Sequence, residues 1–231
     1  MALRPTIDPP FSRAMCWRCR KSARTCYCAD LPKLETRTRF VILQHPKEAR
    51  NPIGTGRLAH LALADSLLLQ GVDFSEDARL NALIEEPAHS CAILYPGPGV
   101  VSLSGLSDED RGRLIPADRR FVLFVIDGTW AGARPVLRRS RNLARLPRVS
   151  FEMAGVSAYQ GVRKQPRSDC LSTIEAIGRV LRAIESPALE EKLLAPFLRM
   201  VAQQLAFGEG STVRTEGRRV SSVGASSRAS E

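Results

Sequence analysis

The feature that most constrains the fold of this chain is a run of six consecutive apolar residues at 121–126, Phe-Val-Leu-Phe-Val-Ile. Its β-branched and aromatic residues favour a strand, and its lack of polar alternation is typical of a strand covered on both faces. Further strand-like runs lie at 39–44, 92–95 and 149–151, and helix-like segments alternate with the strands. This alternation predicts an α/β domain with a mostly parallel sheet.

Two helices are expected between these strands. Residues 58–70 place apolar side chains at helical spacing, and Gly71 would end that helix. Residues 131–141 are also expected to be helical, provided that Pro135 falls in the first turn, where a missing N–H is tolerated.

The C-terminal part has a clear helix start at Ser172-Thr-Ile-Glu175. This spacing fits a capping box, in which the serine and glutamate side chains each accept a hydrogen bond from the other's backbone N–H. A further helix is expected to begin at Ser186-Pro187 and to be interrupted or bent at Pro196.

Four of the six cysteines lie close together near the N-terminus in the pattern C-x2-C-x6-C-x-C. Thiolates bind Zn²⁺ tetrahedrally, and a C-x2-C turn brings two sulfurs onto one ion. A C-x-C pair in an extended strand would point to opposite faces, so the second pair should lie in a turn. Two disulfides or coincidence are the alternatives, and Cys91 and Cys170 are expected to be small core residues. The predicted structural zinc ligands are Cys16, Cys19, Cys26 and Cys28.

The formal net charge is +10, which favours a polyanionic partner such as RNA, although a generally basic surface would give the same charge. No segment has the length or apolar content of a membrane span, and the N-terminus lacks the apolar region of a secretion signal. We therefore expect no membrane association, and a cytoplasmic location.

Polar and turn-forming residues follow three of the expected strands, at 94–97, 127–130 and 158–166. Ligands of open parallel α/β sheets bind beyond the carboxyl ends of the strands, so Asp127 should face a crevice there. A helix cap is the alternative role for Asp127 or Thr129. No dinucleotide fingerprint, phosphate-binding P-loop or serine-hydrolase elbow is present, and the three histidines form no evident catalytic metal set.

Together, six motifs in one order resemble the DTW-domain family. Besides the cysteine pattern they are His45-Pro-Lys-Glu48, Thr55-Gly-Arg-Leu-Ala-His60, Leu94-Tyr-Pro-Gly97, Asp127-Gly-Thr-Trp130, and Tyr159-Gln-Gly-Val-Arg-Lys-Gln165 with Ser172-Thr-Ile-Glu175. Members of that family are tRNA-uridine aminocarboxypropyltransferases. The resemblance implies a SPOUT-like fold with a C-terminal knot that holds S-adenosylmethionine. It also implies transfer of the 3-amino-3-carboxypropyl group to N3 of a tRNA uridine in the variable loop, with methylthioadenosine as the other product.

The resemblance gives each motif an expected role. Asp127, Thr129 and Trp130 would be catalytic, with Asp127 removing the N3 proton or steadying the sulfonium, and Trp130 pressing on the cofactor. The expected cofactor-binding residues are Leu94, Tyr95, Pro96, Gly97, Asp127, Trp130, Arg163, Lys164, Gln165, Ser172, Thr173 and Glu175. The expected RNA-binding residues are Arg57, Arg134, Arg138 and Arg139.

We expect four segments: a loose lead-in at 1–13, the zinc knuckle at 14–35, the catalytic domain at 36–207 and a disordered tail at 208–231. Two other functions fit the same residues, namely an S-adenosylmethionine-dependent RNA methyltransferase and a non-catalytic RNA-binding zinc protein. Besides tRNA, no obligate protein partner is evident from the sequence.

Overall fold

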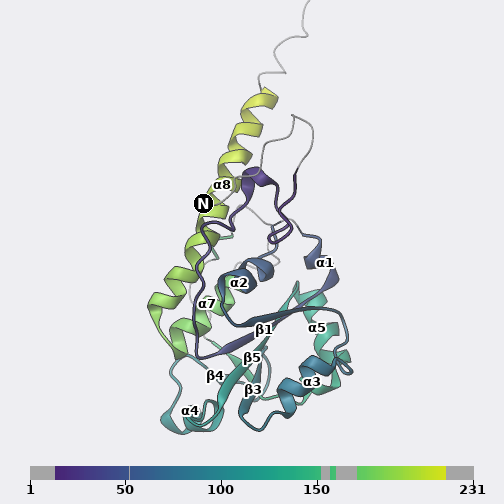
Figure 1. The fold of residues 1–231 in the computed structure, drawn as a ribbon, viewed down its shortest axis with the longest axis vertical. Coiled ribbons are helices and arrows are strands. Elements are labelled where there is room, and N and C mark those ends of the chain that lie inside the picture. The colour runs from purple at the N-terminus through teal and green to yellow at the C-terminus, as the bar shows by residue number, and fades with distance from the viewer. Residues whose placement is uncertain (1–13, 52, 152–156, 160–170, 217–231) are drawn as a thin grey trace, which may run out of the picture.

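The computed structural model describes residues 14–51, 53–151, 157–159 and 171–216, and its centre is a six-stranded sheet (Figure 1). The strands lie in the order β2-β1-β5-β3-β6-β4, and every neighbouring pair is parallel. The expected parallel α/β architecture is thus confirmed. The strands are β1 (Arg39–Gln44), β2 (Ser66–Gln70), β3 (His89–Leu94), β4 (Val101–Ser102), β5 (Arg120–Asp127) and β6 (Arg148–Ser150).

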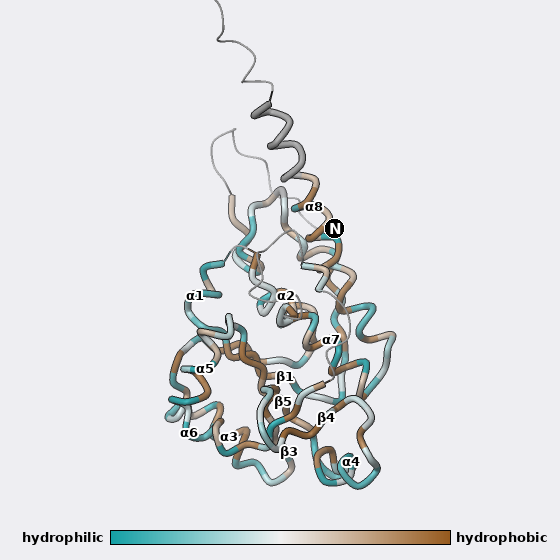
Figure 2. Tube along the Cα trace, turned by 180° about the vertical axis from the view of Figure 1, so that it is seen from behind, coloured by the Kyte–Doolittle hydropathy of each residue, from teal (hydrophilic) through white to brown (hydrophobic). Residues whose placement is uncertain are grey.

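Helices cover both faces of the sheet. Phe40 and Ile42 of β1 pack into one core with side chains of α2, α7 and α8, whereas Val41 and Leu43 pack on the other face with α3, α5 and α6. The apolar colour of Figure 2 gathers on the central strands between these two layers. The helices are the short 3₁₀ turn η1 (Ala23–Thr25), α1 (Pro46–Ala49), α2 (Gly56–Ala62), α3 (Ala78–Glu85), α4 (Asp108–Leu114), α5 (Trp130–Arg139), α6 (Arg141–Ala144), α7 (Thr173–Ile184) and α8 (Pro187–Glu216).

The winding direction of the chain reverses between β1 and β5. From β1 the chain passes through α1 and α2 to β2 on one side, but from β5 it passes through α5 and α6 to β6 on the other. In open parallel sheets, ligands bind at such a switch point, outside the carboxyl ends of the strands. Gln44 and Asp127, the last residues of β1 and β5, are register partners at this point.

The expected helix over 58–70 is wrong in its second half. Helix α2 ends at Ala62, and residues 66–70 form strand β2. Consecutive leucines there serve both faces of the sheet, because Leu68 packs against one core and Leu67 and Leu69 against the other. Asp65, just before β2, forms ion pairs with Arg39 and Arg120 at the starts of β1 and β5.

Both prolines lie inside helices, and the expected place of Pro135 in a first turn is wrong. Pro135 is the sixth residue of α5 rather than part of its first turn, and α8 continues through Pro196 without interruption. In each case the carbonyl that loses its partner belongs to an exposed residue, Ala131 or Lys192. Water can therefore satisfy these carbonyls, which reduces the cost of the missing N–H.

The cysteine-containing segment is joined to the core at Leu34, which is buried. Its N–H donates to the Ala62 carbonyl and its carbonyl accepts from the Ala64 N–H, both at 2.9 Å. At the other end, α8 runs to Glu216, past the expected start of a tail at 208. Residues 1–13 and 217–231 lie outside the described part of the chain, as do 160–170, on whose path the expected knot depends. Among the described helices, none combines the length and apolar content required to cross a membrane.

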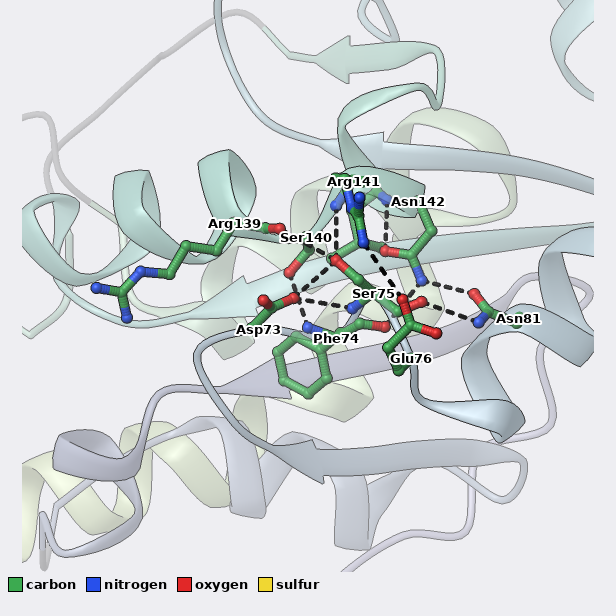
Figure 3. Close-up of polar contacts among 10 residues, drawn as sticks. Asp73, Phe74, Ser75, Glu76, Asn81, Arg139, Ser140, Arg141 and Asn142 are labelled. Atoms are coloured by element: carbon green, nitrogen blue, oxygen red, sulfur yellow. Dashed lines mark hydrogen bonds and ion pairs between the residues drawn. The ribbon is translucent and has the colours of Figure 1, made fainter.

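A polar network ties the loop after β2 to the junction of α5 and α6 (Figure 3). The buried Ser140 hydroxyl accepts a hydrogen bond from the Phe74 N–H at 3.0 Å. The Asn142 amide donates to the Phe74 carbonyl at 2.9 Å and to the Asn81 side chain at 2.7 Å. The network holds the end of α5, and so helps to fix the helix that follows Asp127.

Candidate functional site

Asp127 ends the central strand, and its side chain is almost completely buried, with 3% exposed. The Gln44 side-chain amide donates to its Oδ2 at 2.8 Å, and the Thr173 hydroxyl donates to its Oδ1 at 2.5 Å. The Gln70 amide in turn donates to the Gln44 carbonyl oxygen at 3.1 Å. Side chains from β1, β2 and α7 thus hold this carboxylate in one orientation at the switch point.

Gly56 lets helix α2 approach this carboxylate. A Cβ atom at position 56 would lie 2.3 Å from Asp127 Oδ2 and 2.5 Å from its Cγ, which is far closer than atoms pack. The glycine of the Thr55-Gly-Arg motif is therefore required by contact with Asp127. Sequence reasoning had assigned no site role to Gly56 or Gln44, although Gly56 was part of a quoted motif.

Thr129 caps helix α5, because its hydroxyl accepts a hydrogen bond from the Gly132 N–H at 3.3 Å. The cap that we considered as an alternative role for this residue is thus present. Trp130, the first residue of α5, is 49% exposed. Its ring lies edge-to-face on Tyr95 with centroids 5.9 Å apart and an interplanar angle of 67°. Two residues expected to bind the cofactor therefore meet, one on the loop that follows β3 and the other at the start of α5.

Arg148 adds a cation to this aromatic pair. Its guanidinium carbon lies 5.9 Å from the Tyr95 ring centroid, and a Cβ at Gly97 would lie 3.1 Å from one guanidinium nitrogen. Gly97 also has φ +155°, a conformation that side chains other than hydrogen disfavour. Of the other loop residues, Leu94 ends β3 against the core and Pro96 is exposed.

The capping box at Ser172 and Glu175 is confirmed, and it reaches further than its own helix. The buried Glu175 carboxylate accepts hydrogen bonds from the Ser172 N–H at 2.8 Å, the Ser157 hydroxyl at 2.7 Å and the Ala158 N–H at 2.8 Å. It therefore joins residues 157 and 158 to the start of α7, and these lie on either side of the segment 160–170 in the sequence. Arg163, Lys164 and Gln165 belong to that segment and lie outside the described residues.

The four cysteines near the N-terminus converge on one point. Their sulfur atoms all lie within 4.8 Å of one another, with Cys16 and Cys28 at 3.8 Å and Cys19 and Cys26 at 3.7 Å. Tetrahedral zinc with bonds of about 2.3 Å requires sulfurs about 3.8 Å apart, so this donor set fits Zn²⁺. The first pair lies on a tight turn closed by the Arg20 N–H on the Cys16 carbonyl at 2.7 Å, with Arg20 at φ +59°.

The four thiols do not ionise alike without a metal. A hydrogen bond from the Cys19 backbone lowers the pKa of Cys16 to about 6, whereas burial raises the pKa of Cys26 and of Cys28. A bound dication favours the thiolate form of every ligand, because its charge offsets both burial and mutual repulsion. Outside the cluster, burial raises the pKa of Cys91 to about 11, as expected for a core thiol. Cys170 lies outside the described residues.

A pocket lies between the cysteine segment, at 14–35, and the α/β core. Arg20, Lys21 and Tyr27 line it from the cysteine side, and Gln44, Glu48 and Arg57 line it from the core. Burial lowers the pKa of Arg57, and the nearby positive charge of Arg20 lowers it further. Through Gln44 the pocket adjoins the residues that hold Asp127.

The arginines expected to contact RNA do not form one cluster. Arg134, Arg138 and Arg139 are exposed along α5, whereas Arg57 belongs to the pocket beside the cysteines. His45 caps α1 through its Nδ1, which accepts from the Lys47 N–H at 3.2 Å.

The sequence of the chain is similar to sequences of one protein family. The family model described as "DTW domain" matches residues 13–205. The chain is 31% identical to tRNA-uridine aminocarboxypropyltransferase 2 of Drosophila melanogaster, over 88% of this chain and 80% of the relative. It is 29% identical to the Macaca fascicularis protein of the same name, over 87% and 67%, and 27% identical to tRNA-uridine aminocarboxypropyltransferase A of Arabidopsis thaliana, over 85% and 83%. No solved structure shows significant similarity to the chain. The chain belongs to the DTW domain family.

Proposed function

We propose that this chain is a tRNA-uridine aminocarboxypropyltransferase that uses S-adenosylmethionine as donor and N3 of a uridine in the variable loop of tRNA as acceptor. The observation that carries the proposal is the buried Asp127, held at the switch point by Gln44 and Thr173. Relatives that match most of this chain are named tRNA-uridine aminocarboxypropyltransferases, and these names support the same reaction.

The aromatic pair beside Asp127 suits a positively charged sulfur. A cation over the face of a tryptophan or tyrosine ring gains about 0.5–2 kcal/mol. Tyr95, after β3, and Trp130, at the start of α5, lie at the carboxyl edge of the sheet, and half of Trp130 is open to a ligand. Ser172 and Thr173 stand at the start of α7 on the same edge, and we assign Arg163, Lys164 and Gln165 to the carboxylate end of the donor or to an RNA phosphate. We also propose that the segment between β6 and α7 forms a SPOUT-like knot around the donor.

In the proposed reaction, N3 of uridine forms a bond to the terminal side-chain carbon of the methionine part of the donor. The bond from that carbon to sulfur breaks with its electron pair on sulfur, which releases methylthioadenosine. The N3 proton must leave, and we assign Asp127 to accept it or to stabilise the charge that develops. All three carbons on a sulfonium are electrophilic, so the position of the donor against Trp130 and Asp127 decides which group moves.

We propose that the RNA lies across α5 and the carboxyl edge of the sheet. Arg134, Arg138 and Arg139 are exposed there, and each phosphate contact should contribute to the salt dependence of binding. The cysteine cluster would hold structural Zn²⁺, and a tRNA substrate would place the protein in the cytoplasm.

The test is product analysis after incubation of the zinc-loaded protein with S-adenosylmethionine and unmodified tRNA. We expect equal amounts of methylthioadenosine and aminocarboxypropyl-uridine, and no product from tRNA whose variable-loop uridines are replaced by cytidine. S-adenosylhomocysteine with methylated RNA would instead identify a methyltransferase. Binding of tRNA with no calorimetric signal for S-adenosylmethionine would identify a non-catalytic RNA-binding protein.

A further inference from the structure

The pocket between the cysteine segment and the core has no part in the chemistry proposed above. Among its lining residues three are cations, Arg20, Lys21 and Arg57, and one is a carboxylate, Glu48. Within the described part of the chain, no carboxylate forms an ion pair with Arg20 or Arg57. The charge of Arg20 disfavours the charged form of Arg57, and a phosphate between the two guanidinium groups would remove that repulsion.

The position of the pocket favours a nucleic acid phosphate as that anion. Trp17 lies in the same tight turn as Arg20, between Cys16 and Cys19, and is 85% exposed. An exposed indole beside arginines is the combination on which unpaired RNA bases stack while their phosphates are neutralised. The opposite wall includes Gln44, which donates to Asp127, so a phosphate in the pocket would lie close to the proposed reaction site.

Resting on the proposed function, we infer that Arg20 and Arg57 clamp one phosphate of the tRNA beside the reactive uridine, so that the cysteine segment forms one wall of the RNA site. Arg20 comes from the metal-binding turn and Arg57 from α2, whose Gly56 packs on Asp127. The clamp thus joins the position of the cysteine segment to the position of the substrate. Guanidinium groups suit this role, because each presents a planar pair of donors to phosphate oxygens.

The experiment measures tRNA binding by the zinc-loaded full chain, without S-adenosylmethionine, at several salt concentrations. The variants are Arg20→Asn, Arg57→Ala and the double change, and asparagine is chosen at position 20 because it tolerates the positive φ. Arg111→Ala is the charge-matched control, since this exposed arginine lies on α4, at the far end of the molecule from the cysteine segment (Figure 1). Zinc content and melting temperature of each variant establish that the fold is retained.

We expect each single change to weaken tRNA binding by about three- to tenfold and to reduce the salt slope by about one unit. The double change should lose little more than either single change, because both arginines hold the same phosphate. Affinity and slope equal to those of Arg111→Ala would overturn the inference. So would additive losses, which indicate two separate contacts.

Calorimetry with S-adenosylmethionine on the same variants tests whether the pocket instead binds the carboxylate of the donor. Unchanged donor affinity agrees with an RNA phosphate, whereas a loss of donor affinity with unchanged tRNA binding would assign the pocket to the donor carboxylate and overturn the inference. Because tRNA binding is measured without transfer, a failure to form methylthioadenosine would contradict the proposed function and leave the binding result intact.

Discussion

At the scale of single residues, the hydrogen-bond donors around Asp127 fix the orientation of its carboxylate. Both carboxylate oxygens accept a hydrogen bond, one from Gln44 and one from Thr173. In Asp127→Asn, the amide keeps one oxygen but turns an NH₂ group toward one of these donors. We expect a loss of stability of about 1–3 kcal/mol. We also expect single-turnover transfer at saturating S-adenosylmethionine to slow by about 100-fold or more. Transfer at the original rate would contradict the role assigned to this carboxylate.

The contact between Gly56 and Asp127 gives a second prediction for a single residue. In Gly56→Ala the new methyl group would overlap the carboxylate, so either the carboxylate or α2 must move. We expect a destabilisation of about 1–3 kcal/mol together with a loss of transfer. Gly112→Ala is the matched control, because Gly112 also lies in a short helix and a Cβ there meets no atom within 4 Å. Thermal unfolding should show that change to be neutral, or stabilising by up to about 1 kcal/mol.

The residue-level site could be predicted only where a residue follows a strand or begins a helix. Asp127 was singled out on that basis and Thr173 through the family resemblance, and the structure joins them by a hydrogen bond. Gln44 was expected only as the last residue of a strand, because nothing in the sequence states which strand lies beside β5. The pairing of β1 with β5, which brings Gln44 to Asp127, is set by long-range packing of both strands.

At the scale of elements, the network around Ser140 holds the end of α5 against the loop after β2. Ser140→Ala removes the acceptor of the buried Phe74 N–H and should destabilise the protein by about 1–3 kcal/mol. Ser75→Ala, in the same network, should cost about 1 kcal/mol or less, because water can reach the groups that it leaves. Denaturant unfolding of both variants measures the difference. Equal losses would show that the burial of Ser140 is unimportant.

Element boundaries show why sequence periodicity was insufficient. The strands at 39–44 and 121–126 were evident from apolar runs, and the sheet confirms them. Residues 66–70 were assigned to a helix because Leu68 and Leu69 continue the helical spacing of the apolar residues at 58–62. A strand covered on both faces can place leucines at the same positions. Helix α4 was missed, although Ser107 caps it and three acidic residues follow in its first turn.

At the scale of the whole molecule, the cysteine segment contacts the α/β core in two places. It joins α2 through backbone hydrogen bonds of Leu34, and it lines a pocket with Gln44 and Arg57 of the core. Both contacts lie near the switch point of the sheet, where β1 and β5 end. A metal that fixes this segment therefore also fixes one side of the proposed RNA site, and its removal should affect substrate binding more than the sheet.

That reasoning gives a prediction for metal loss. We expect one zinc ion per chain by elemental analysis, lost in Cys26→Ser and retained in the matched control Cys91→Ser, since Cys91 lies outside the cluster. Without zinc, Arg20 is no longer held opposite Arg57, so tRNA affinity and salt slope should fall to the values of Arg20→Asn. The sheet has its own buried cores on both faces, so the far-ultraviolet circular dichroism should remain close to that of the parent protein. A Cys26→Ser protein that lacks zinc but binds tRNA with the full salt slope would show that the metal only folds its own segment.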